Sequence, residues 1–318
     1  MASYERGLVD LGSGLYAWMQ PDGGWGWSNA GLIRDGEAAI LVDTLFDEAL
    51  TAEMLTAMAD ATGLATDRIG TVVNTHANGD HTHGNALLPD ADIVASEASA
   101  REMEAFSPAL LGQMKAAGTA GQLGLAGTYF AEIFAPFDFA AARGRAPTRT
   151  FHGRLDLKVG DKDVVLLEVG PAHTAGDILV HVPTDRTVFT GDILFIDETP
   201  IMWEGPVSNW LAACDAILAM DVDHIVPGHG PLTDKAGVRA VQDYLRHIDT
   251  EARVRFEAGL SAEDAARDIG LGRFASWTDA ERIGVNVDTL YREFSGDHSP
   301  RDTMALFERM GRLYYDRR

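Results

Sequence analysis

The stretch that decides the fold of this 318-residue chain runs from residue 75 to residue 85 and reads Thr75-His76-Ala77-Asn78-Gly79-Asp80-His81-Thr82-His83-Gly84-Asn85. An apolar run that ends at Asn74 precedes it and a second begins at Ala86, so the stretch lies where a strand ends and a helix begins. Imidazoles and a carboxylate at alternate positions of one tight turn can converge on a cation, and zinc favours this mixture of nitrogen and oxygen ligands. The alternative is a polar loop in which Asp80 only caps the next helix.

Three further segments share this layout, in which an apolar run stops at a side chain that can bind a metal. They are residues 169–177 with His173, residues 188–192 with Asp192, and residues 225–230 with His229. In α/β proteins, residues that carry the chemistry are typically placed on loops at the ends of strands. Four such segments together favour a metal centre over an accidental series of polar loops.

The four segments resemble the signature of the metallo-β-lactamase-fold superfamily, which is His-x-His-x-Asp-His followed by a histidine, a bridging aspartate and a final histidine. The resemblance runs from about Tyr16 to Gly230 and implies an α/β fold, an αββα sandwich of two mixed sheets with outer helices. It also implies two metal sites with these ligands: His76 and His173 at the first, Asp80, His81 and His229 at the second, and Asp192 bridging both.

Asn78 departs from the signature, because it stands where the family has its second histidine, and Asp80-His81 fixes the register. A neutral amide oxygen is a poorer zinc ligand than an imidazole. Either the first site binds its metal weakly and recruits water or substrate, or Asn78 makes a hydrogen bond beside a centre in which one metal suffices. We expect one or two zinc ions as the cofactor, with iron or manganese as the other candidates.

Composition restricts the function further. The formal net charge of -22 argues against a nucleic-acid surface, which needs basic patches, although an acidic balance also serves solubility. Cys214 is the only cysteine, so no intramolecular disulfide can form, and we expect it to be a buried thiol on a helix. Neither a secretory signal nor an apolar segment long enough to span a bilayer is visible, which favours a cytoplasmic protein that does not bind membranes.

We expect residues 1–235 to form the metallo-β-lactamase-like domain and residues 236–318 to form a helical C-terminal extension packed on it. Period-2 and apolar runs predict these strands: 15–19, 28–33, 38–42, 70–74, 91–95, 154–159, 164–169, 178–182 and 187–190. Helical patterns cover these ranges: 46–61, a segment from 97 capped by Ser96, 236–258, 261–269, 279–294 and 301–315. Ser261–Asp264 and Thr278–Glu281 resemble capping boxes. The apolar stripe that begins at Ile283 predicts packing on the same domain, with a homodimer contact as the alternative.

An apolar insertion at about 106–148, rich in alanine, glycine, methionine and phenylalanine, interrupts the metal motifs. We predict a helical lid over the cleft, the alternative being a helical cluster that only packs on the sheet. A lid of this composition suits a bulky apolar or aromatic small-molecule substrate. The candidate substrate contacts are aromatic: Trp25, Trp27, Tyr129, Phe130, Phe134 and Trp203. His83 is expected at a solvated first-turn position of the helix, and the alternative is a position behind the metal ligands or facing the substrate.

These features predict a metal-dependent hydrolase that attacks an activated carbonyl of an ester, thioester, lactone or lactam with a metal-bound hydroxide, which Asp80 would orient as the catalytic residue. No Gly-x-Ser-x-Gly elbow offers another nucleophile. A second hypothesis is an aromatic polyketide cyclase or thioesterase that uses the metal as a Lewis acid. It rests on residues 20–23, the aromatic loop and the variant motif, which resemble bacterial relatives of those enzymes. A third is a metal-binding protein without turnover.

Overall fold

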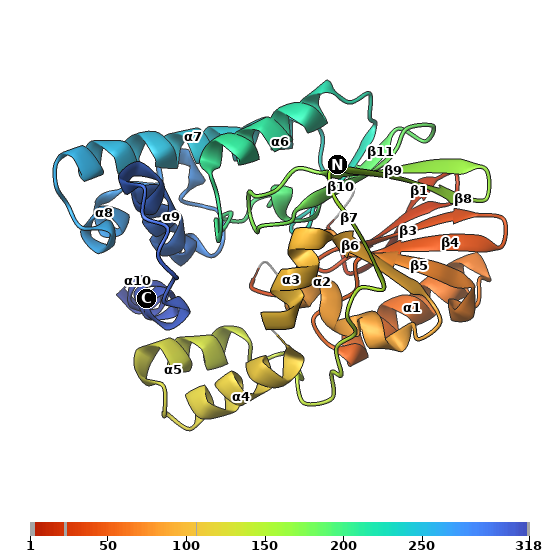
Figure 1. Ribbon diagram of the computed structural model, residues 1–318, viewed down its shortest axis with the longest axis horizontal. Helices are drawn as coiled ribbons and strands as arrows, with labels where there is room; N and C mark the ends of the chain where they lie inside the picture. The colour runs from red at the N-terminus through yellow and green to blue at the C-terminus, as the bar shows by residue number, and fades with distance from the viewer. Residues whose placement is uncertain (1–3, 22–23, 106, 317–318) are drawn as a thin grey trace.

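Two β-sheets packed face to face, with helices outside both, form the architecture of the computed structural model (Figure 1). The structure describes residues 4–21, 24–105 and 107–316. Residues 1–3 of the N-terminus, Asp22 and Gly23 of the aromatic loop, and Phe106 at the start of the insertion therefore lie outside the described residues. The predicted αββα sandwich of two mixed sheets is confirmed.

The first sheet has the strand order β1-β2-β3-β4-β5-β6-β7. The first four strands pair antiparallel and β4 to β7 pair parallel, so the sheet is mixed. The bounds are β1 (Gly7–Gly12), β2 (Leu15–Met19), β3 (Ala30–Asp35), β4 (Ala38–Val42), β5 (Ile69–Val73), β6 (Asp92–Ser96) and β7 (Arg149–Phe151).

The second sheet has the order β12-β11-β10-β9-β8, in which β11 and β12 are parallel and the other neighbours antiparallel. The bounds are β8 (Arg154–Val159), β9 (Lys162–Glu168), β10 (Ile178–Val182), β11 (Thr187–Phe189) and β12 (His224–Val226). One face of each sheet contributes to a shared apolar core, as expected for aligned sheets. Representative members of that core are Leu15, Ile33, Val42, Val73, Val164, Leu166, Val180 and Phe189.

Helices cover the outer faces. On the first sheet lies α1 (Glu48–Thr62), which Asp47 caps by accepting a hydrogen bond from the Leu50 N–H, and its buried methionines pack on the sheet. On the second sheet lie α6 (Val207–Ala219) and α7 (Lys235–Glu257). Cys214 of α6 is buried in this layer, and burial raises the pKa of its thiol to about 12, so the predicted core thiol is confirmed.

The remaining helices gather beyond one end of the sheets (Figure 1). They are α3 (Glu97–Ala105), α4 (Pro108–Thr119), α5 (Gly124–Ile133), α8 (Ala262–Asp268), α9 (Ile283–Ser295) and α10 (Thr303–Asp316). The insertion thus contains α4 and α5, and α10 packs against α5 although more than 150 residues separate them. Within the described parts of the chain, no helix has both the length and the apolar composition required to cross a membrane.

Three sequence expectations differ from the structure. Strands β1 and β7 were not expected, because β1 is half-exposed at a sheet edge and β7 has only three residues. Ser261 does cap α8 through the Asp264 N–H, but Thr278–Glu281 forms no capping box. Glu281 instead accepts hydrogen bonds from two aromatic side chains distant in sequence.

Candidate metal centre

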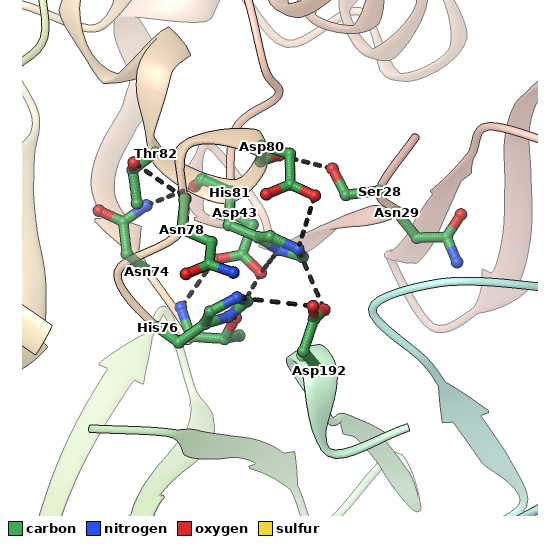
Figure 2. A network of polar contacts seen from close by, with 12 residues as sticks. Ser28, Asn29, Asp43, Asn74, His76, Asn78, Asp80, His81, Thr82 and Asp192 are labelled. Atoms are coloured by element: carbon green, nitrogen blue, oxygen red, sulfur yellow. Dashed lines mark hydrogen bonds and ion pairs between the residues drawn. The ribbon is translucent and has the colours of Figure 1, made fainter. Parts of the chain in front are cut away.

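Six polar side chains meet at one edge of the sandwich, where strands of both sheets end. His76 follows β5, and Asp80 and His81 lie in the short helix α2 (Gly79–Thr82). His173 follows β9, Asp192 lies in a turn directly after β11, and His229 follows β12. Figure 2 shows His76, Asp80, His81 and Asp192 turned toward one another. All six are buried.

The six side chains form two clusters, His76 with His173 and Asp192, and Asp80 with His81 and His229. In each cluster one ligand-type atom per residue lies within 4.8 Å of the others. Asp192 connects the clusters, because its carboxylate oxygens face the Nε2 atoms of four imidazoles: His81 at 3.1 Å, His173 at 3.3 Å, His229 at 3.4 Å and His76 at 3.6 Å.

The chemistry of this donor set fits a divalent metal. The Nε2 atoms of His76 and His81 and the Oδ1 atom of Asp192 are buried and face one another without a hydrogen bond of good geometry, although His81 Nε2 and Asp192 Oδ1 lie 3.1 Å apart. Buried polar atoms without a partner are costly, so a bound ion that accepts their lone pairs removes a penalty. Imidazole nitrogen with carboxylate oxygen is a set that zinc, iron and manganese accept.

Hydrogen bonds behind the imidazoles orient their Nε2 atoms toward the centre. His81 Nδ1 donates to Asp43 Oδ2 at 2.9 Å, and His173 Nδ1 donates to the Ile201 carbonyl at 2.6 Å. The Thr75 hydroxyl donates to Asp43, so it can accept the hydrogen of His76 Nδ1 at 3.1 Å. Each Nδ1 therefore keeps a proton when metal is bound, and Nε2 is the atom that would face the ion. In the metal-free protein the carboxylates of Asp192, Asp80 and Asp43 outweigh burial and raise the pKa of His81 well above its usual value.

Replacing Asp43 by asparagine is expected to weaken metal binding by about 10- to 100-fold, because His81 loses a charged acceptor that fixes its tautomer and orientation. Asp43 also accepts hydrogen bonds from the Thr75 N–H and hydroxyl, both at 2.7 Å, so the metal loop loosens as well. Competition for metal with a chromophoric chelator measures the affinity. Asp156→Asn, at an exposed position of β8, is the control, and equal affinities of the two variants would contradict the role of Asp43.

Charges inside the cluster favour an incoming cation. Burial opposes ionisation of Asp192, yet the surrounding imidazoles, His229 first, hold the pKa of its carboxyl well below the usual value. Burial lowers the pKa of His76 and of His173, so both rings are neutral ligands at pH 7. Burial alone would lower the pKa of His229, but the carboxylates of Asp192 and Asp80 raise it to about 10. Metal uptake therefore releases a proton, and affinity increases with pH.

The amide of Asn78 lies at the first cluster, where its Nδ2 atom is 3.1 Å from His173 Nε2 (Figure 2). The side chain thus occupies the place that the family signature gives to a histidine, beside a ligand atom. Asn78 contacts the imidazole of His173, with which it would share a metal ion. Both alternatives for Asn78, weak ligand and hydrogen-bonding neighbour, remain compatible with this position.

Two side chains from the loop before β3 hold the second cluster in place. The Ser28 hydroxyl donates to the Asp80 carbonyl at 2.5 Å, and the Asn29 amide donates to the Pro227 and Gly230 carbonyls on both sides of His229. Gly228 is required because any side chain there would collide with Asp192 and with the Gly191 backbone. No local pattern predicted a role for Ser28 or Asn29, because their partners are distant in the chain.

A pocket of about 320 Å³ opens onto both clusters. Its walls are mainly apolar and come from the aromatic loop, α4, α5, α10 and the segment after Asp192. The principal wall residues are Trp25, Phe46, Leu111, Met114, Phe130, Phe134, Phe195, Trp203, Leu306 and Phe307, with the polar Glu102, Glu204, Arg282 and Arg301. Aromatic surfaces suit a flat, apolar ligand.

Four of the six aromatic residues expected to contact substrate line this pocket: Trp25, Phe130, Phe134 and Trp203. The other two are not among its lining residues. Tyr129 is fully buried and donates to Glu281 at 2.8 Å, whereas Trp27 packs on Phe137 at 5.0 Å between ring centroids. Residue spacing along a loop or helix did not reveal which ring faces the cavity.

The expectation for His83 was wrong. The ring is buried rather than solvated and lies against Phe46, with 5.6 Å between ring centroids. Phe139, which belongs to the insertion, packs edge-on against the ring of His83 and covers it. No local sequence pattern around His83 predicts this contact with Phe139.

The fold is a two-sheet α/β sandwich, and its two His/Asp clusters are connected by one aspartate. These features define a class of metal-binding proteins whose ligands lie on loops at the ends of strands. The family model described as "Metallo-beta-lactamase superfamily" matches residues 23–229, and the chain belongs to this superfamily. The resemblance inferred from the ligand motifs is therefore confirmed.

Two curated relatives match the sequence. The "2,4-dinitroanisole O-demethylase subunit alpha" of Nocardioides sp. (strain JS1661) is 24% identical over 306 residues, which cover 90% of this chain and 74% of the relative. The "Beta-lactamase-like protein 2 homolog" of Caenorhabditis elegans is 29% identical over 77 residues, 24% of this chain and 25% of its own.

Solved structures share the fold at low identity. The sec-alkylsulfatase Pisa1 from Pseudomonas sp. superposes with a TM-score of 0.69 at 14% identity, covering 93% of this chain and 52% of its own, so the chain spans about half the length of that sulfatase. A metallo-beta-lactamase from Pontibacter korlensis has a TM-score of 0.55 at 17% identity and covers 76% of this chain and 99% of its own.

Proposed function

We propose that the protein is a metal-dependent hydrolase that opens an activated carbonyl, in an ester, thioester, lactone or lactam, of a bulky apolar or aromatic substrate. One observation carries this proposal: a single pocket of about 320 Å³ joins both metal-ligand clusters to a wall of aromatic side chains. The enclosure by α4, α5 and α10 supports the idea of a lid that excludes water from the ring-binding part of the pocket.

The residues of the metal centre would have two roles, to bind the metal and to orient the attacking water. His76, His173 and Asp192 would hold one ion, with Asn78 beside them, and the Asp80 cluster would hold the other. Bound there, a divalent metal lowers the pKa of coordinated water to near 7 and polarises a carbonyl. Burial opposes the charge of Asp80, but the neighbouring imidazoles, His81 first, hold the pKa of its carboxyl far below its usual value. Asp80 is therefore an anion that can orient the attacking water by accepting a hydrogen bond from it.

The aromatic walls position the rest of the substrate. Trp25 stands edge-on to Phe134, with 6.0 Å between centroids, and Trp203 lies 6.2 Å from Phe307. These rings come from four separate segments of the chain, so a substrate that fills the pocket contacts both the sandwich and the helices beyond it. A planar ring held between such faces is kept in one orientation relative to the clusters.

A second candidate is cleavage of an activated aryl ether. The observation that favours it is the O-demethylase subunit, whose similarity extends over 90% of this chain and so reaches beyond the residues that the superfamily model matches. An aryl methyl ether and an aryl ester present the same flat ring to the pocket and differ at the atom attacked. Metal binding without turnover stays a prediction that the same experiment tests. Ring closure of a polyketide stays a prediction that needs a polyketide substrate.

The experiment is a substrate panel with the chelated protein reloaded with zinc, manganese or iron. The panel contains an aryl ester, an aryl thioester, a lactone, a β-lactam and 2,4-dinitroanisole. We expect metal-dependent hydrolysis of the aryl ester or thioester, with an aliphatic acetate cleaved at least about tenfold less efficiently because it leaves the aromatic walls unfilled. Turnover of dinitroanisole alone would replace the carbonyl proposal by the ether one. Stoichiometric metal with no turnover of any compound would favour a binding protein.

A further inference from the structure

Two carboxyl groups in the pocket have no place in the metal clusters, and only one of them is partly enclosed. The acidic side chains of the pocket wall are Asp80, Glu102, Asp192 and Glu204, of which the first and third belong to the clusters. Glu204 is exposed, whereas Glu102 is half-buried. The described wall residues include no tyrosine, lysine or cysteine, and both histidines are cluster residues. Glu102 is therefore the enclosed group that can carry a proton without leaving a metal.

The position of Glu102 is built into the fold. It lies on α3, whose start is fastened to the loop after His173, since the Ser96 and Ser99 hydroxyls both donate to the Gly176 carbonyl, at 2.7 and 2.9 Å. The Glu102 carboxylate accepts the Ala175 N–H, at 3.2 Å to Oε2 and 3.4 Å to Oε1. Because Ala175 comes two residues after His173, this bond holds the carboxyl beside the loop that supplies a ligand.

The surroundings of Glu102 raise the pKa of its carboxyl into the neutral range. Burial raises the pKa of its carboxyl to about 7, and the like charge of Glu204 adds to this, although the Ala175 N–H acts in the opposite direction. Arg101 on the same helix lowers the pKa, and Asp177 and Arg301 are the other ionisable groups in this region. A carboxylic acid with a pKa near the working pH is suited to proton transfer.

We propose that Glu102 is the general acid that protonates the leaving group in the reaction catalysed at this pocket. Water, oriented by Asp80, delivers its oxygen to the acyl carbon and releases one proton to solvent. The bond from that carbon to the leaving oxygen breaks, and the leaving oxygen takes the proton of the Glu102 carboxyl. Glu102 regains a proton from water at the pocket mouth, so the sum is ester plus water giving acid plus alcohol. This inference rests on the proposed hydrolase function.

A series of benzoate esters whose leaving groups range from 2,4-dinitrophenol through 4-nitrophenol and phenol to ethanol tests the role. Glu102→Gln keeps the side-chain volume and removes the proton. We expect kcat for the phenyl and ethyl esters to fall about 100-fold or more, whereas the dinitrophenyl ester, whose phenolate leaves without help, loses less than about threefold. For the phenyl ester, wild-type kcat should fall as pH rises through about 7, and this limb should be absent in Glu102→Gln.

Glu104→Gln is the matched control, because it makes the same change at an exposed position of the same helix. It should leave the whole series unchanged. A second readout is the titration of carboxyl carbons in ¹³C-glutamate-labelled protein with and without metal, in which the resonance missing from Glu102→Gln should titrate near pH 7.

Each outcome decides one point. A uniform loss across the esters, or no loss, overturns the acid role while leaving the hydrolase intact. A Glu102 carboxyl that titrates near pH 4 also overturns it, whatever the rates. A metal-loaded wild type that cleaves no member of the series overturns the proposed function, and the role of Glu102 with it.

Discussion

Replacing Asp192 by alanine is expected to lower kcat/KM by about 10³-fold or more and to reduce metal content from both clusters together. The physical reason is that Asp192 faces four imidazoles, at 3.1 to 3.6 Å, so its loss removes one anionic ligand from each cluster. A bound metal ion stabilises the transition state by several kcal/mol, which corresponds to a rate change of about three orders of magnitude. Metal per chain, measured by mass spectrometry, and hydrolysis of the best panel substrate report the two effects.

Asp161→Ala, at an exposed turn between β8 and β9, controls for the loss of an aspartate as such. Circular dichroism shows whether the fold is kept, which we expect because the centre lies at a sheet edge and outside the apolar core. If Asp192→Ala retained full metal at one cluster and lost it at the other, Asp192 would serve a single ion and would not be shared.

Replacing Asn78 by histidine is expected to tighten the weaker metal site by about 100-fold and to bring the stoichiometry at moderate zinc concentration to two ions per chain. Roughly 10–16 kcal/mol of binding free energy spread over four zinc ligands is about 3 kcal/mol each, or about two orders of magnitude. The new imidazole would replace a neutral amide that already lies 3.1 Å from His173 Nε2. Isothermal titration calorimetry of the chelated protein measures both quantities.

Asn78→Ala separates the two interpretations of the wild-type residue. If the amide is a weak ligand, alanine should lower the affinity of the first site further. If the amide only donates a hydrogen bond beside a one-metal centre, alanine should leave the single strong site intact. Two equal sites in the wild type, unchanged in Asn78→His, would disprove the idea of a weakened first site.

Much of the fold could be predicted because short-range sequence patterns specify many of its strands and helices. Strands β2, β4, β8 and β10 were predicted to the residue, since alternating or continuous apolar runs bounded by turns specify a strand wherever it pairs. Strand β1 escaped prediction because an edge strand with half-exposed side chains lacks such a run. Strand β7 has three residues and owes its conformation to pairing with β6.

The sequence by itself determined the fold class and the six side chains that gather at the sheet edge, because each lies in a segment that follows an apolar run and strand ends of a sandwich meet at one rim. Only the tertiary structure decided which aromatic residues face the pocket, placing Trp25 there and turning Tyr129 into the helical core. It likewise buried His83 and brought Phe307 of α10 to the cavity. These outcomes depend on contacts between segments more than 50 residues apart, and such packing has no period or spacing in the chain.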